Sequence, residues 1–101
     1  MICALTVREL KPGTFEEFHE KFMEGADDLP EGWVRFNMIR NAENPNEVIT
    51  FGFFDGSIEE LRASAAEAGY EDQLESIAPF VEVTGADGLY EVLEERTPPN
   101  A

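Results

Sequence analysis

The sequence is poor in cysteine, histidine and basic residues. Its 101 residues include one cysteine, Cys3, one histidine, His19, and only 7 lysines and arginines. A single cysteine excludes an internal disulfide and any site built from several thiolates. A single histidine with no neighbouring thiolate or second imidazole gives no metal-ligand pattern. We therefore expect neither a disulfide nor a bound metal.

Acidic residues, in contrast, are abundant. There are 22 aspartates and glutamates against the 7 basic residues, which gives a formal net charge of -15. Such a surface repels nucleic-acid phosphates and anionic lipids, so we expect no nucleic-acid partner and no membrane partner. The first residues, MICALTV, have no basic region, and their apolar run is too short for a signal peptide or a membrane span. The expectation is a cytoplasmic protein.

The length and composition fit one globular domain. A chain of this length has no room for two hydrophobic cores, and 43% hydrophobic with 11% aromatic residues argues against disorder. We expect a single domain over residues 1–95. Residues 96–101, RTPPNA, are expected to form a flexible tail because paired prolines disfavour both helix and strand.

The N-terminal part predicts a strand followed by a helix. Residues 2–10 are rich in β-forming residues and end at the turn signal of Pro12 and Gly13. Thr14 and Glu17 have the spacing of a capping box, and Gly25 is the expected end of the helix. One helical stripe contains Phe15, Phe18, His19, Phe22 and Met23.

The rest of the chain predicts the remaining elements of an α+β fold. We expect strands at 33–40 and 47–54, a helix from Ser57 to Gly69, a helical segment from Tyr70 to Pro79, and a strand at 89–95. Ser57 and Glu60 form a second capping-box pattern. The order β-α-β-β-α-β predicts a ferredoxin-like, four-stranded antiparallel sheet with helices on one face.

Both faces of the predicted sheet carry apolar side chains. In the strand at 47–54, Ile49, Phe51 and Phe53 lie on one face, and Val48 and Phe54 lie on the other. Helices can cover only one of these faces, and soluble monomers rarely expose so large an apolar patch. We therefore expect a homodimer that buries the two open sheet faces against each other.

Two stretches resemble a known family. PEGWVRFNMIRNAENPNEVITFGFFDGSIEEL and YEDQLESIAPFVE are similar to segments of the antibiotic-biosynthesis-monooxygenase-like family, in the dimeric α+β barrel superfamily, over about residues 2–95. The resemblance implies a dimeric barrel with a ligand cavity between the sheet and the helices of each subunit.

The resemblance also implies a type of chemistry. The family's quinone-forming oxygenases bind a polycyclic phenol, assist its deprotonation and let the anion react directly with dioxygen, without metal or flavin. The implied function is a cofactor-independent monooxygenase, an oxidoreductase acting on a small aromatic or polyketide-like phenol, with no cofactor. The alternatives are a non-catalytic dimeric module that binds a small ligand, and an isomerase. Haem degraders need an asparagine near Thr6 and a histidine on the second helix, and this chain has neither.

The resemblance points to two candidate residues on the third strand. The family's asparagine and tryptophan on that strand correspond to Thr50 and Phe54. Thr50 can hydrogen-bond a phenol or hydroperoxide as a catalytic residue, and Phe54 can form an aromatic wall. The alternative is that Thr50 favours the strand conformation and Phe54 fills the core.

The remaining catalytic candidates are His19, as a base, and Tyr70, as a phenol donor at the cavity mouth. His19 equally fits a structural position beside the phenylalanine stripe. Further substrate-binding candidates are Thr6, Phe18, Phe22, Trp33 and Asn37.

Two orientations stay open at this stage. If the Trp33 face of its strand looks into the cavity, Trp33 is a stacking wall and Asn37 a polar anchor; otherwise both lie at the dimer interface. The alanines of RASAAEAG, residues 62–69, can either leave an open slot over the sheet or allow close helix packing. Arg8 and Arg40, at strand ends, are expected to pair with carboxylates.

Overall fold

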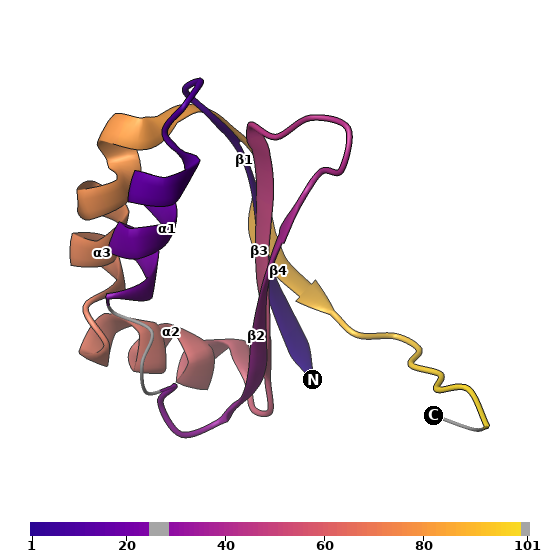
Figure 1. The fold of residues 1–101 in the computed structure, drawn as a ribbon. Helices are drawn as coiled ribbons and strands as arrows, with labels where there is room; N and C mark the ends of the chain where they lie inside the picture. The colour runs from indigo at the N-terminus through magenta and orange to yellow at the C-terminus, as the bar shows by residue number, and fades with distance from the viewer. Residues whose placement is uncertain (25–28, 100–101) are drawn as a thin grey trace.

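A four-stranded antiparallel sheet carries all the helices on one of its faces (Figure 1). The computed structural model describes residues 1–24 and 29–99. The elements are β1 (Ile2–Leu10), α1 (Phe15–Met23), β2 (Trp33–Arg40), β3 (Glu47–Phe54), α2 (Ile58–Glu67), α3 (Tyr70–Ile77), the short 3₁₀ helix η1 (Ala78–Phe80) and β4 (Val81–Glu91). The strand order is β2-β3-β1-β4. This confirms the predicted ferredoxin-like α+β fold.

The first three strands have the predicted bounds, but the last strand does not. β4 covers Val81–Glu91 rather than 89–95. Gly85 and Gly88 interrupt the apolar pattern of this segment, so the sequence pattern does not identify it as a strand. Its pairing with β1 over nearly the whole strand, with two register irregularities, supplies the hydrogen bonds that local propensity does not predict.

The two predicted capping boxes have different outcomes. At the start of α2, the Ser57 hydroxyl accepts a hydrogen bond from the Glu60 amide at 3.1 Å, and the Ser57 amide donates to the Glu60 carboxylate at 3.0 Å. These bonds hold the pKa of Glu60 below its usual value. The capping box predicted at the start of α1 is wrong, because the Thr14 side chain accepts no hydrogen bond from the first turn of the helix. Its hydroxyl instead donates to the carbonyl of Lys11 at 2.7 Å and closes the turn before the helix.

The buried core falls into two clusters. The larger consists of Leu10, Phe18, Phe22, Val48 and Ile77, and packs α1 and α3 against β1 and β3. The smaller consists of Ile2, Phe54 and Leu61, and packs α2 against the opposite ends of β1 and β3. The helix layer therefore rests on the sheet at two separate places.

The register of β2 resolves its orientation. Phe36 and Met38 pair with Gly52 and Thr50 of β3, and Asn37 pairs with Phe51. An irregularity between Trp33 and Arg35 places Trp33 opposite Phe54. Trp33 therefore lies on the helix face, while Asn37 lies on the open face. The expectation that these two residues share a face is corrected, because the extra residue of a bulge breaks the period-two alternation.

The open face of the sheet is apolar along its central strands. No helix lies on this side in Figure 1, among the residues that the structure describes. The side chains on this face include Leu5, Val7, Ile39, Ile49, Phe51 and Phe53. Within the same described residues, no helix is long and apolar enough to cross a membrane.

The capping box at α2 makes a testable contribution to stability. Replacing Ser57 by alanine leaves an amide of the first turn without its side-chain acceptor, so Ser57→Ala should lower the free energy of unfolding by about 1 kcal/mol. Glu60→Ala should also lower it at neutral pH. Glu17→Ala, at the start of α1, is the matched control and should have a smaller effect because Glu17 belongs to no box.

The effect of Glu60 should depend on pH. A carboxyl group whose pKa is lowered in the folded state stabilises the protein above its unfolded pKa, and this contribution is lost as the pH falls through the folded pKa. The difference between the wild type and Glu60→Ala in urea denaturation should therefore shrink from pH 7 to pH 3. A difference that grew in acid would contradict this account.

Candidate functional site

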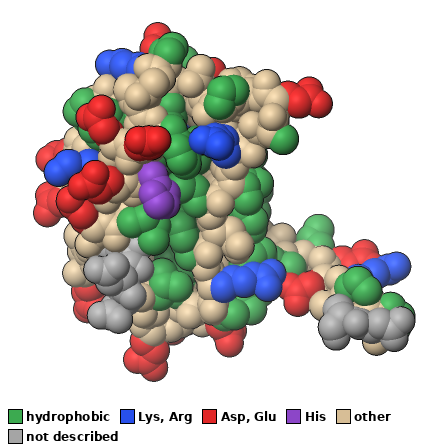
Figure 2. Space-filling view, in the orientation of Figure 1, with side chains coloured by type: hydrophobic (Ala, Val, Ile, Leu, Met, Phe, Trp, Pro, Cys, Tyr) green, Lys and Arg blue, Asp and Glu red, His purple; other side chains and the backbone are tan. Residues whose placement is uncertain are grey.

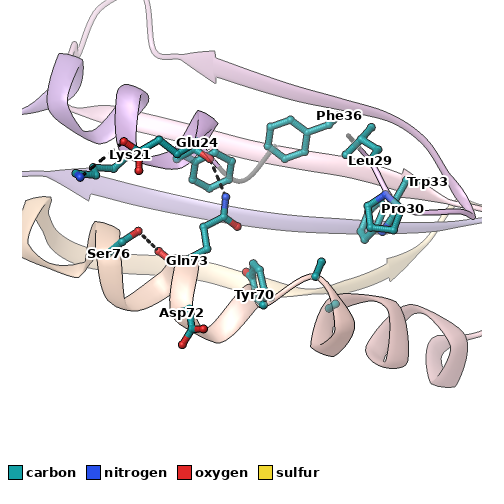
Figure 3. A pocket seen from close by; sticks show the side chains of 14 residues that line it. Lys21, Glu24, Leu29, Pro30, Trp33, Phe36, Tyr70, Asp72, Gln73 and Ser76 are labelled. Atoms are coloured by element: carbon teal, nitrogen blue, oxygen red, sulfur yellow. Dashed lines mark hydrogen bonds and ion pairs between the residues drawn. The ribbon is translucent and has the colours of Figure 1, made fainter. Parts of the chain in front are cut away.

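A hollow lies between the helix layer and the sheet. Its inner part, of about 200 Å³, is lined from the sheet by Ala4, Thr6, Thr50, Gly52, Asp87 and Leu89, and from the helices by Phe22, Leu61, Ala65 and Tyr70. An outer part, of about 440 Å³, shares with it Phe22, Trp33, Phe36, Ala65 and Tyr70. Figure 3 shows this outer part. The two parts form a continuous apolar slot of the kind that binds small ligands.

The hollow exists because the residues at its centre are small. Ala4 pairs with Gly52, and Thr6 pairs with Thr50, in adjacent rows of the sheet. From the helix layer, Ala65 faces the inner part and Ala68 the outer part. These side chains are too short to meet, and the two core clusters hold the layers apart on either side. The small residues of α2 thus leave an open slot.

Trp33 forms the aromatic wall of this slot. Its indole lies across Gly52, where an added Cβ would be only 2.9 Å from the ring. Phe54 packs edge-to-face behind it, with ring centroids 5.2 Å apart. Phe54 therefore packs against the indole without lining the slot itself, whereas Trp33 lines both parts of the slot.

Polar side chains cross the floor of the inner part in one row. Thr50 of β3, Thr6 of β1 and Asp87 of β4 occupy paired positions on adjacent strands. The Thr6 hydroxyl donates to an Asp87 carboxylate oxygen at 3.0 Å. Asp87 is the only acidic residue among the described residues that line the inner part. It lies in a segment that was not expected to form a strand, so the sequence analysis missed it.

Arg8 lies beside this row and is almost completely buried, with 3% of its surface exposed. Its guanidinium donates to the Thr50 hydroxyl at 2.9 Å and lies 5.8 Å from the centre of the Phe22 ring. The prediction that Arg8 pairs with a carboxylate is wrong, because Arg8 forms no ion pair with any described residue. Because side chains alternate between the two faces of a strand, Arg8 shares its face with Ile2 and Thr6. The sequence alone therefore indicated that Arg8 points toward the helix layer if those residues do.

Arg40 also lacks the expected carboxylate partner among the described residues. It is exposed at the edge of the sheet, where its guanidinium lies 4.6 Å from the centre of the Phe15 ring.

The mouth of the slot is formed by α1 and α3. Tyr70, 37% exposed, lines both the inner and the outer parts. Gln73 donates from its side chain to the Phe22 carbonyl at 2.8 Å and ties α3 to α1, as Figure 3 shows. Lys21 and Glu24, drawn beyond Gln73 in Figure 3, complete the polar rim.

The structure brings together five of the predicted site residues and leaves four outside the slot. Those that line it are Thr6, Phe22, Trp33, Thr50 and Tyr70. The other four do not line the slot, so the expectation that they face the cavity is corrected. They are His19, Phe18, Asn37 and Phe54.

Each of the four has a different reason for lying elsewhere. His19 is exposed and stacks on Phe15, and the single histidine is visible on the surface in Figure 2. Phe18 is fully buried in the larger core cluster. Asn37 lies on the open face, and Phe54 lies behind the indole. Within the described residues, no group of three His, Cys, Asp or Glu side chains is placed to hold a metal ion.

The chain is similar in structure to several solved proteins. A protein from Deinococcus radiodurans, provisionally named an antibiotic biosynthesis monooxygenase, superposes with a TM-score of 0.79 at 11% identity, over 97% of this chain and 98% of that one. A protein with the same provisional name from Chloroflexus aurantiacus gives 0.77 at 16% identity, over 95% and 96% of the two chains.

A third similar structure has a more specific description. SnoaB from Streptomyces nogalater, described as a cofactor-independent oxygenase, superposes with a TM-score of 0.70 at 16% identity, over 97% of this chain and 96% of that one. No protein-family model matches the chain. No curated protein matches it in sequence. The likeness to antibiotic-biosynthesis-monooxygenase-like proteins is therefore confirmed at the level of the fold.

The contact between Trp33 and Gly52 makes the shape of the slot testable. A methyl group in Gly52→Ala would meet the indole at 2.9 Å, so the ring must shift. Overpacking of this kind should lower the free energy of unfolding by about 1–3 kcal/mol. Because Trp33 is the only tryptophan, its fluorescence spectrum should change in this variant.

Gly85→Ala, on β4, is the matched control for this substitution. Its Cβ would come no closer than 3.6 Å to any neighbour. An unchanged Trp33 emission spectrum in Gly52→Ala, or an equal change in both variants, would contradict the proposed packing.

Proposed function

We propose that the protein is a cofactor-independent monooxygenase that acts on a small aromatic or polyketide-like phenol. The observation that carries the proposal is the apolar slot with one polar row across its floor. Trp33 and the stacked pair of Phe22 and Phe36 offer apolar walls to an aromatic ring, and we place the phenol oxygen of the substrate at the polar row. The similarity of the fold to a cofactor-independent oxygenase supports the same conclusion.

Thr50 is suited to donate a hydrogen bond to the substrate. A hydroxyl has one hydrogen to donate and two lone pairs that accept. Arg8 donates to the Thr50 oxygen, so the Thr50 hydrogen stays available for an acceptor in the slot. A hydrogen bond from the cationic guanidinium also polarises this hydroxyl, which strengthens its interaction with a developing phenolate.

Asp87 is suited to accept the phenol proton. It is the one carboxylate on the floor of the inner part among the described residues, and the hydrogen bond from Thr6 fixes one of its oxygens. Its other oxygen is free to act as a general base. Trp33 supplies an indole ring at the slot, whereas the position corresponding to the family's tryptophan is Phe54, which lies outside it.

The proposed reaction needs no further redox group. Loss of a proton to Asp87 makes the substrate electron-rich, and the anion transfers electrons to dioxygen. One oxygen atom then enters the product as a quinone carbonyl, and the other leaves as water with two hydrogens, the phenol proton first held by Asp87 and the hydrogen of the oxidised ring carbon. The apolar walls cover the aromatic body of the substrate, while Asp87, which is exposed to solvent, can pass the proton on to water.

Oxygen uptake in metal-free buffer tests the proposal. With anthrone and naphthol substrates, the wild type should consume oxygen and form the quinone. Asp87→Asn should lower kcat/KM by roughly 100-fold, the effect expected for loss of a general base. Thr50→Ala should lower it by about 10-fold, the effect of one hydrogen bond, and Tyr70→Phe should lower it less.

His19→Ala is the control in these measurements, because His19 is exposed and lies outside the slot. It should leave the rate unchanged. Wild-type protein that binds these phenols without consuming oxygen would contradict the oxygenase proposal and favour the non-catalytic binding module.

The open sheet face supports a second proposal, that the protein acts as a homodimer. Its central strands expose a row of apolar side chains, and Ile39 is 48% exposed on this face. Burial of such a face against a second copy would remove it from water and back the floor of each slot with another sheet.

Light scattering after size-exclusion chromatography tests the dimer. The wild type should show twice the 11.3 kDa mass of one chain. Phe51→Glu, in the centre of the open face, should shift the protein to the monomer because it would bury unpaired charges at the interface. Met23→Glu, an exposed position on the helix layer, is the control and should stay dimeric. A monomeric wild type at micromolar concentration would contradict the proposal.

A further inference from the structure

The guanidinium of Arg8 uses only part of its hydrogen-bonding capacity. It carries several N–H donors in a planar fork, and one of its nitrogens, Nη1, donates to Thr50. The described residues offer its other nitrogens no hydrogen-bond acceptor. Among the described residues, these nitrogens do not belong to the buried side-chain atoms that lack a hydrogen-bond partner. They are therefore in contact with solvent-accessible space.

That space is a third hollow of about 400 Å³ beside the inner part of the slot. Arg8 lines it together with Thr6, Asp87 and residues of α3. Thr6 and Asp87 also line the inner part, so the two hollows share these two side chains. The guanidinium also contacts Thr50 and Phe22, which line the inner part, so it lies between the third hollow and the slot.

Burial of a cation without a paired anion is costly. Removal of a guanidinium from water costs several kcal/mol unless an anion compensates. Two carboxylates, Glu82 and Asp87, line the same hollow, but neither lies within ion-pair distance of Arg8. Asp87 is held by Thr6, and both carboxylates are exposed to solvent. The buried charge thus lacks a direct counterion in a protein whose net charge is -15.

We infer that Arg8 binds a carboxylate of the ligand, so that the substrate class is an aromatic carboxylic acid. The fork of a guanidinium matches a carboxylate with two parallel hydrogen bonds. The aromatic body of such a ligand extends from Arg8 past Phe22 and into the slot, toward Trp33. This inference deepens the proposed function and rests on it for the reacting phenol group, but the binding of the acid is independent of turnover.

A pair of ligands of the same shape tests the inference. Isothermal titration calorimetry with 2-naphthoate and naphthalene-2-carboxamide compares an anion with a neutral analogue. The wild type should bind the naphthoate at least about 10-fold more tightly, which corresponds to about 1.4 kcal/mol. The acidic surface disfavours anions in general, so this preference requires a specific cation.

Substitutions at arginine positions identify that cation. Arg8→Met keeps much of the side-chain volume but removes the charge, and should bring the two affinities within about 2-fold of each other. Arg8→Lys, which keeps the charge but not the fork, should retain part of the preference. Arg62→Met is the matched control, because Arg62 is exposed on α2 and lines none of these hollows. It should keep the full preference.

Thermal unfolding without ligand separates this role from a purely structural one. If Arg8 is retained for ligand binding, Arg8→Met should keep the wild-type Tm or raise it, because the variant buries no charge. Equal affinity for the two ligands in the wild type, no binding of naphthoate, or an unchanged preference in Arg8→Met would each overturn the inference. Naphthoate preference without oxygen uptake would support the carboxylate site and contradict only the oxygenase proposal.

Discussion

The structure depends on how the helix layer is held above the centre of the sheet. Large side chains at the two ends of the helix face, such as Phe18 and Phe54, form separate core clusters. Between them, Ala4, Gly52 and Ala65 are too small to bridge the layers. Because the helices rest on the outer clusters, the middle stays open, and the slot is a consequence of the distribution of side-chain volume.

The polar groups of the slot belong to the sheet rather than to the helices. Adjacent strands bring Thr50, Thr6 and Asp87 into one row, and Arg8 into the next. A sheet fixes such positions well, because ladder hydrogen bonds hold each backbone and leave the side chains few rotamers. The helices supply apolar cover and the mouth, where Tyr70 remains partly exposed. This division gives the slot a rigid polar floor beneath an apolar roof.

Much of the fold could be predicted from local patterns. The strands at 33–40 and 47–54 and the capping box of Ser57 and Glu60 depend on neighbouring residues, and they were predicted with the observed bounds and contacts. The failures share another cause. β4 depends on pairing with β1 across most of the chain, and Thr14 bonds to a turn carbonyl instead of the helix. Neither partner is identified by sequence spacing.

The candidate site was predictable where the local period of a strand or a helix was uninterrupted, as it was for Phe22 and Tyr70 on the helices. Thr6 and Thr50 follow period-two patterns, and the same pattern contained the signal for Arg8. The bulge before Arg35 moved Trp33 to the helix face, and the pairing of β4 brought Asp87 beside Thr6. By itself, the sequence determined the element order, the apolar character of both sheet faces and the small residues that prevent the centre from filling. Only the tertiary structure decided which polar groups meet there, because register and bulges depend on hydrogen bonds between strands that are distant in the chain.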